Sequence, residues 1–309
     1  MKALSAALVL ALIPAPALAS DHPKPMGEFA LKVVTDLNSA QRVQGTAGER
    51  AAATKIKGYL RAFGYTPAVQ KFSFTRKGVT YHSRNVVATL KGTSKRTVVI
   101  GAHYDNRVEG MGADDNASGV SVMLEVAKRM AKKPKPDYTV KFVAFGAEEN
   151  PGGLVGSTRF VKRMSAAQIE RTAAMINYDS LIVGDYMYVH AGANRKVWPR
   201  DRMLQIAEKY RLPLQTQPGW NPEYPAGFTP NGFSDYTAFN KAGIPVVAFE
   251  STNWEIADKD GYTQTEQHGS YWHTPNDNLQ TILADYPQRP GVRLYVYTKA
   301  TMEFLRSLR

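Results

Sequence analysis

Apolar runs alternate with amphipathic segments along this 309-residue chain, and the alternation constrains its fold more than any other feature of the sequence. Such a pattern predicts strands interleaved with helices around a largely buried sheet. Because no Gly/Ser-rich or Pro-rich linker interrupts the pattern, we predict a single α/β domain with a mostly parallel, mixed central sheet flanked by helices. The predicted strands are 85–90, 97–102, 139–145, 173–178, 186–190 and 245–249. The predicted helices are 48–63, 119–130, 155–164, 199–210, 234–241 and 292–308.

The N-terminus has the pattern of a secretory signal. Lys2 is followed by an apolar centre, 4–12, and by small residues around Ala19. We therefore expect residues 1–19 to be a signal peptide cut near Ala19, and 20–309 to form an exported domain, periplasmic or secreted. The apolar centre is too short to cross a bilayer, and no later stretch reaches roughly 18 apolar residues, so no membrane span is predicted.

Charge and cysteine content narrow the classes of function. The chain has no cysteine, which excludes disulfides, thiolate metal sites and cysteine nucleophiles. Its net charge is +12, and it falls to +11 when Lys2 leaves with the signal. The basic residues are spread along the chain apart from one cluster at 128–136, which we interpret as a helix end and a solvated loop. We predict no nucleic-acid partner, and adhesion to an anionic envelope stays open.

Polar residues collect where the predicted strands and loops end. In open α/β sheets, ligands bind in the crevice outside the carboxyl ends of the strands, so these residues predict one site. The polar segments are 103–105 (HYD), 112–116 (GADDN), 148–149 (EE), 177–179 (NYD) and 271–275 (YWHTP).

Five carboxylates would meet at such a site, and no lysine or arginine lies within these segments. Like charges at short range need a counter-charge, and metal cations supply it. Imidazole with carboxylate, without thiolate, suits catalytic zinc. Two ions about 3.5–4 Å apart also give a bridging role to one carboxylate. The five carboxylates are Asp105, Asp115, Glu148, Glu149 and Asp179.

In order and spacing these segments resemble the co-catalytic zinc aminopeptidases of the M28 type, from about Gly45 to about Leu279. The matching motifs are 45–50 (GTAGER), 101–105 (GAHYD), 112–119 (GADDNASG), 146–149 (GAEE), 177–179 (NYD) and 273–275 (HTP). The resemblance implies the zinc exopeptidase, phosphorylase/hydrolase-like fold and two Zn²⁺ ions per chain, with Mn²⁺ or Co²⁺ as substitutes.

The resemblance also implies a role for each residue. His103 and Asp179 would hold one zinc, Glu149 and His273 the other, and Asp115 would bridge them. Glu148 would be the general base, and Asp105 would orient the imidazole of His103. The substrate would be a peptide or protein N-terminus whose amine lies near Glu148 and Asp179, and we expect a monomer.

Some positions keep more than one interpretation. Asp114 is expected to be a loop or cap residue, and Asp235 either a helix cap or a support for the site. Trp272 stands where several M28 enzymes have a tyrosine that steadies the oxyanion, so Tyr271, Tyr262 or the zinc ions alone are the alternatives. The other histidines are expected to be structural; they are His22, His82, His190 and His268.

The second half of the chain resembles one exported bacterial member of the family that prefers basic N-terminal residues, arginine above all. The segments concerned are 181–185 (LIVGD), 218–221 (PGWN), 252–254 (TNW) and 259–262 (KDGY). A carboxylate would pair with the arginine side chain of such a substrate. Candidates to line the pocket for that side chain are Glu250, Glu255, Asp258, Asp260 and Glu266. Two alternatives are a glutaminyl cyclase of the same fold, with one zinc, and a non-catalytic binding module.

Overall fold

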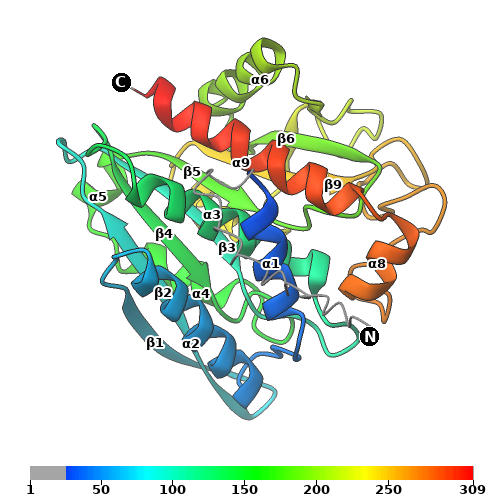
Figure 1. The fold of residues 1–309 in the computed structure, drawn as a ribbon, viewed down its shortest axis with the longest axis horizontal. Coiled ribbons are helices and arrows are strands. Elements are labelled where there is room, and N and C mark those ends of the chain that lie inside the picture. Colours follow the sequence, from blue (N-terminus) through cyan, green and yellow to red (C-terminus); the bar gives the residue numbers. More distant parts are fainter. Residues whose placement is uncertain (1–25, 309) are drawn as a thin grey trace, which may run out of the picture.

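The central sheet has the strand order β1-β2-β4-β3-β5-β9-β6-β7, with β8 paired to β6 (Figure 1). This computed structural model describes residues 26–308, so the predicted signal peptide lies outside the described residues. The strands are β1 Ala68–Arg76, β2 Val79–Leu90, β3 Thr97–His103, β4 Thr139–Phe145, β5 Thr172–Tyr178, β6 Tyr186–Gly192, β7 Leu214–Gln215, β8 Phe228–Thr229 and β9 Val246–Thr252. The helices are α1 Glu28–Leu37, α2 Ala47–Ala62, a π-helical turn η1 Ala113–Ser118, α3 Gly119–Ala131, α4 Val155–Lys162, α5 Ala166–Arg171, α6 Trp198–Tyr210, α7 Tyr236–Lys241, α8 Leu279–Asp285 and α9 Arg289–Ser307.

Four central strands, β4, β3, β5 and β9, run parallel, whereas β1–β2, β2–β4 and β6–β9 pair antiparallel. This confirms the predicted single α/β domain with a mostly parallel, mixed sheet. Alternation along the strands sends side chains to two cores: Val98 and Ile100 pack beneath α1, α2 and α3, while Val99 packs on the other face with Phe160 of α4 and Phe239 of α7. None of the helices between residues 26 and 308 combines the length and the apolar character needed to cross a bilayer.

All six predicted strands and all six predicted helices are present, with shifts at their ends. The sequence did not predict β1, which pairs with β2 in a hairpin, because its apolar alternation is limited to Phe72 and Phe74 and most of its other side chains are exposed. It also missed α1, α5, α8 and the two-residue strands β7 and β8. Helix α5 buries no residue at all and therefore has no apolar stripe.

Helix α3 is buried on nearly every side, because α1 and α9 cover the face that points away from the sheet (Figure 1). The buried residues of α3 include polar Ser121 and Glu125 as well as apolar side chains. Glu125 lies on the covered face and accepts a hydrogen bond of 2.8 Å from the backbone N–H of Ala30 in the first turn of α1. The N-cap residue of α1, Gly27, offers no side-chain cap, so Glu125 supplies an acceptor from a distant part of the chain.

We expect Glu125→Ala to lower the free energy of unfolding by about 2–3 kcal/mol, because it removes a charged acceptor from a buried backbone N–H. Urea unfolding followed by circular dichroism measures the change. Glu208→Ala, an exposed position on α6, is the matched control and should stay within about 0.5 kcal/mol of the parent. An equal loss in both variants would contradict a capping role for Glu125.

Candidate metal centre

Functional side chains gather at the carboxyl edge of the parallel strands, where the sequence predicted one site. Three of the contributing segments follow β3, β4 and β5, a fourth is η1, and a fifth is the loop before α8. The structure therefore brings together residues from five separate parts of the chain. They are His103, Asp115, Glu148, Glu149, Asp179 and His273.

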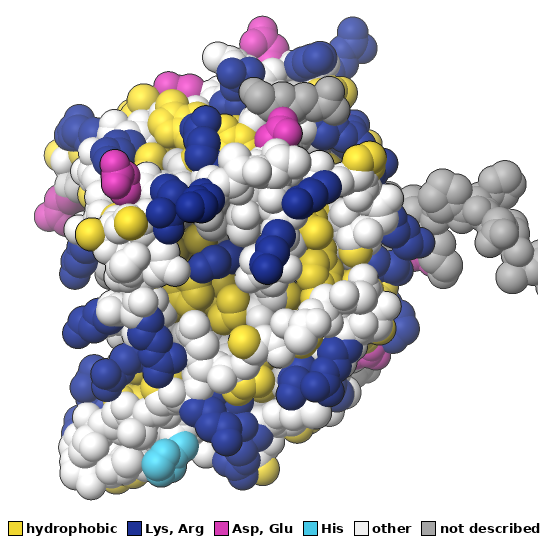
Figure 2. Space-filling view, turned by 90° about the vertical axis from the view of Figure 1, so that its left-hand side faces the viewer, with side chains coloured by type: hydrophobic (Ala, Val, Ile, Leu, Met, Phe, Trp, Pro, Cys, Tyr) yellow, Lys and Arg dark blue, Asp and Glu magenta, His cyan; other side chains and the backbone are white. Residues whose placement is uncertain are grey.

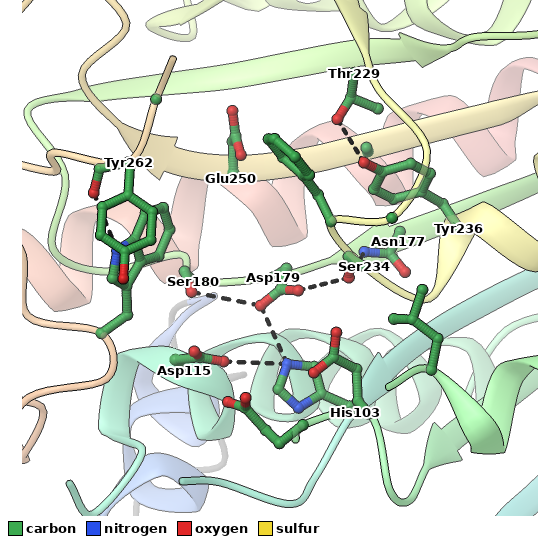
Figure 3. Close-up of a pocket in the computed structure, with 18 of the residues that line it drawn as sticks. His103, Asp115, Asn177, Asp179, Ser180, Thr229, Ser234, Tyr236, Glu250 and Tyr262 are labelled. Carbon is green, nitrogen blue, oxygen red and sulfur yellow. Dashed lines mark hydrogen bonds and ion pairs between the residues drawn. The ribbon is translucent and has the colours of Figure 1, made fainter. Parts of the chain in front are cut away.

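Two groups of ligand atoms form there, and they share Asp115. In the first group, His103 Nε2 lies 3.1 Å from Asp115 Oδ1 and 3.2 Å from Asp179 Oδ1 (Figure 3). In the second, His273 Nε2 lies 3.2 Å from Asp115 Oδ2 and 3.5 Å from Glu149 Oε2. Within each group the ligand atoms lie within 4.8 Å of one another. The two oxygens of one carboxylate thus face two separate positions.

The donor set fits two divalent cations that accept nitrogen and oxygen ligands. Glu149 Oε1 is buried without a hydrogen-bond partner among the described residues, which suits an atom that binds a cation. Although burial tends to raise it, the pKa of Asp115 is held well below its usual range by hydrogen bonds from His103 and His273. Burial, and next the charge of Asp115, raise the pKa of Glu149 to about 7. These carboxylates thus lie close enough to perturb one another's protonation, and cations bound there would compensate their charge.

Asp105 organises the turn that carries the two glutamates. Its carboxylate oxygens accept hydrogen bonds from the backbone N–H groups of Glu148, at 3.1 Å, and Glu149, at 3.0 Å. The contact to His103 is made mainly by the backbone carbonyl of Asp105, 3.2 Å from Nδ1, because the nearest carboxylate oxygen is 3.8 Å away. Asp105 therefore positions both the imidazole and the glutamate pair, through different atoms.

Glu148 belongs to neither ligand group, yet it lines the same cavity. Burial raises the pKa of its carboxyl well above the usual range, and the neighbouring carboxylates of Glu149 and Asp179 raise it further against the opposing effect of His103. A carboxylate with raised proton affinity beside two cation positions is placed to accept a proton. The two adjacent glutamates thus face different partners.

Arg42 is a buried cation beside this centre that sequence reasoning missed. Its guanidinium donates hydrogen bonds to the backbone carbonyls of Tyr104 at 2.8 Å, Leu37 at 2.8 Å, Met111 at 2.9 Å and Gly112 at 2.7 Å. Burial lowers its pKa to about 10, so it is cationic at neutral pH. No arginine lies within the motifs themselves, but Arg42 reaches them from a loop far upstream in sequence.

Asp277 was also missed, and it fixes the backbone of the bridging residue. Its two oxygens accept the N–H of Asp114 at 2.7 Å and the N–H of Asp115 at 3.2 Å. The carboxylate of Asp114 points away and accepts from the N–H of Ile182 at 2.7 Å and from Gln264 Nε2 at 2.6 Å. We expected Asp114 to be a loop or cap residue. Instead it is buried and joins η1 by hydrogen bonds to the segments that contain Ile182 and Gln264. No local sequence signal marks either contact, since each joins distant residues.

Beside the two groups of candidate ligands a cavity of about 340 Å³ opens between β9 and the loops around Phe233 and Tyr262. Glu250 of β9 lines it, and its Oε1 accepts hydrogen bonds from His190 Nε2 at 2.8 Å and Trp254 Nε1 at 2.6 Å. Figure 3 shows Glu250 above Asp179, on the side of the pocket away from His103. His190, expected to be structural, therefore holds a cavity carboxylate.

The other acidic candidates lie in different surroundings. Asp260 lines the cavity and accepts the N–H of Tyr262 at 2.8 Å, whereas Asp258 is exposed and does not line it. Glu255 and Glu266 do not line it either. Asp235 is fully buried next to the site, and neither of its oxygens has a hydrogen-bond partner within residues 26–308, so burial raises its pKa to about 7.

The surroundings of Tyr271, Trp272 and Tyr262 differ, and they bear on which of these residues could contact the oxyanion. Tyr271 is buried, and its hydroxyl donates to Asp285 at 2.6 Å, so it is committed elsewhere. Trp272 lines the cavity, and its indole N–H donates to the carbonyl of Tyr262 at 3.0 Å. Tyr262 also lines the cavity and is 57% exposed, which leaves its hydroxyl available among the tyrosine alternatives.

Comparisons with known proteins agree with this arrangement. The model of Peptidase family M28 matches residues 85–295. The chain is 33% identical over 306 residues to the alkaline phosphatase isozyme conversion protein of Escherichia coli (strain K12), covering 87% of each chain. A solved zinc aminopeptidase from Bacillus subtilis superposes with a TM-score of 0.74 at 19% identity, covering 90% of this chain and 95% of the other.

A glutaminyl cyclase from Porphyromonas gingivalis superposes almost as well, with a TM-score of 0.73 at 22% identity, covering 92% of this chain and 98% of the other. At such low identity, both superpositions show the fold alone. The family model and the Escherichia coli relative carry more, because the first spans more than half of the chain and the second nearly all of it. The resemblance inferred from the motifs is confirmed: the chain belongs to peptidase family M28.

Proposed function

We propose that this member of family M28 is an aminopeptidase that hydrolyses the first peptide bond of peptides or exported proteins with two zinc ions. The observation that carries the proposal is the pair of ligand groups that share Asp115. His103 and Asp179 would hold one ion, and Glu149 and His273 the other. When bound, zinc polarises the scissile carbonyl and lowers the pKa of water.

The chain's own residues would perform the remaining steps. Glu148 would accept the proton of the attacking water and pass it to the leaving amine. Asp179 and Glu148, on the cavity wall, would attract the substrate's ammonium group, which makes the enzyme an exopeptidase. The hydroxyl of Tyr262 would donate a hydrogen bond to the developing oxyanion. We further propose export, with cleavage near Ala19, and a monomeric enzyme.

Metal content and activity test this proposal together. Removal of metal with a chelator is expected to abolish release of N-terminal residues from a peptide panel, and zinc is expected to restore it at two ions per chain. A single ion per chain, with cyclisation of glutaminyl peptides and no release of residues, would instead identify a glutaminyl cyclase. Two bound ions with neither activity would favour a non-catalytic binding module.

Preference for a basic N-terminal residue is part of the proposal, and Glu250 supports it. One of its oxygens is held by His190 and Trp254, which fixes the carboxylate against the cavity wall. A guanidinium pairs best with such an oriented carboxylate. Asp260 adds a second negative charge to the same cavity.

We expect Glu250→Gln to reduce kcat/KM for arginyl-p-nitroanilide by about 10- to 100-fold, since it removes a charge-assisted hydrogen bond. Turnover of the leucyl compound is expected to stay within about two-fold, because an apolar side chain does not use the charge. Glu255→Gln, nearby but outside the cavity, is the control. Equal losses on both substrates would show that Glu250 supports the pocket's structure and does not set its preference.

A further inference from the structure

Most of the net positive charge lies on one side of the molecule, at the amino ends of the parallel strands. We call this surface the basic edge; it comprises 91–96, 132–137, 162–171, 193–197 and Lys241. These segments contain twelve of the 39 lysines and arginines but only two of the 27 acidic residues, so they account for +10 of the chain's +12. Figure 2 shows such a face, where Lys and Arg side chains surround an apolar hollow and acidic side chains are few.

The segments are neighbours in space. The backbone N–H groups of Thr93 and Ser94 donate to the carbonyls of Pro136 and Asp137, both at 2.9 Å, which joins the first two segments. β3 and β5 pair at Thr97 and Thr172, which brings the 162–171 segment beside them. All twelve cations are exposed, and none forms an ion pair within residues 26–308. Their charge is therefore not compensated by the protein itself.

Two shallow hollows at this edge combine cations with hydroxyl groups. The first, of about 390 Å³, is lined by Lys91, Lys95 and Arg171 together with the hydroxyls of Thr93 and Ser94. The second, of about 450 Å³, shares Thr172 with the first and is lined by Arg96, Lys196 and Trp198, with Glu170 as its one acidic residue. Ammonium, guanidinium and hydroxyl donors together suit phosphate oxygens.

The geometry points to a planar arrangement of phosphates as the partner: we propose that the basic edge binds an anionic lipid surface, with the active-site pocket facing away from it. The cations are spread over a broad face instead of along one groove. Trp198, 40% exposed beside Lys196, is the residue type that favours the headgroup region of a bilayer. Nucleic-acid binding would need aromatic ring faces on which bases can stack. Arg96 covers one face of the Tyr138 ring, and the Trp198 ring stacks on Phe304, so few free ring faces remain for bases.

The opposite polarity of the two edges supports this orientation. The parallel strands begin at the basic edge and end at the metal centre, and a seven-residue strand such as β4 spans about 20 Å. That distance exceeds the Debye length of about 8–10 Å at physiological salt, so the acidic pocket would hardly weaken attraction at the basic edge. A bound enzyme would keep its pocket open to soluble peptides.

Co-sedimentation of the full chain with lipid vesicles tests the proposal. We expect binding to phosphatidylcholine vesicles that contain phosphatidylglycerol, no binding to phosphatidylcholine alone, and release when salt rises from about 0.1 M to about 0.5 M. The triple variant Lys91→Glu/Lys95→Glu/Arg171→Glu is expected to bind at least about ten-fold more weakly. Peptide turnover by this variant should be unchanged, which shows that it is folded.

The matched control is Arg50→Glu/Lys77→Glu/Lys209→Glu, which changes the net charge equally at exposed positions outside the basic edge. It is expected to retain binding. If both triple variants lose binding alike, the interaction follows net charge and the proposal is wrong. Tight binding of a DNA oligonucleotide at the same salt, with no binding to the anionic vesicles, would overturn it in favour of nucleic acid.

Discussion

Glutamine at position 148 is expected to lower kcat by about 10²- to 10⁴-fold and to leave the metal content unchanged. Glu148 belongs to neither ligand group, so its loss removes a proton acceptor without removing a ligand. Its neighbour is expected to behave in the opposite way. Glu149→Gln should reduce the bound metal to about one ion per chain, because the second group then keeps only Asp115 and His273. Metal analysis and turnover of one peptide substrate, measured on the same preparations, separate the two outcomes.

Both substitutions preserve side-chain size and the backbone N–H groups that donate to Asp105. Glu170→Gln, exposed on α5 at the far edge of the sheet, controls for a generic effect of losing one carboxylate. A Glu148 variant that keeps most of its kcat would contradict the assigned role. A Glu149 variant with two ions and full activity would remove Glu149 from the ligand set.

The residues at strand ends could be predicted because their signal is local. An apolar run that stops at His103, or just before Glu148, identifies both the strand and the place where it ends. Parallel pairing of β3 with β4 and β5 then brings these ends to one edge. The five carboxylates and the histidines in these segments, with no lysine or arginine among them, were enough to infer metal ions at that edge.

The residues that hold the ligands in place could not be predicted in this way. Arg42 and Asp277 act on the 104–115 region through contacts to backbone atoms, and such contacts leave no pattern in the sequence of either partner. The same limit applies to α1, which covers α3 and is capped by Glu125 from a distant helix. The local period of apolar residues predicts which face of a helix or strand is buried. The contacts of Arg42, Asp277 and Glu125 depend instead on which distant segments of the chain meet in the fold.

Arg42→Met is expected to lower the free energy of unfolding of the metal-free protein by about 3–5 kcal/mol. The substitution leaves four backbone carbonyls without their donor, and it removes the buried positive charge that faces Asp105, Asp115 and Asp277. Cations held by the two ligand groups would compensate Asp115, which belongs to both groups, and lie near the other two carboxylates. The gain in melting temperature on adding zinc should therefore be larger in the variant than in the parent protein.

Arg42→Lys separates the two contributions of this side chain. Lysine restores the charge, but its three donors on one nitrogen cannot reach four carbonyls that surround a planar guanidinium. We expect its zinc-dependent gain in melting temperature to return to the parent value, while only part of the lost stability is recovered. Arg159→Met, at an exposed position on α4 away from the centre, serves as the control. If Arg42→Met and Arg42→Lys show the same zinc dependence, Arg42 acts through its hydrogen bonds alone, and its charge does not compensate the carboxylates of the site.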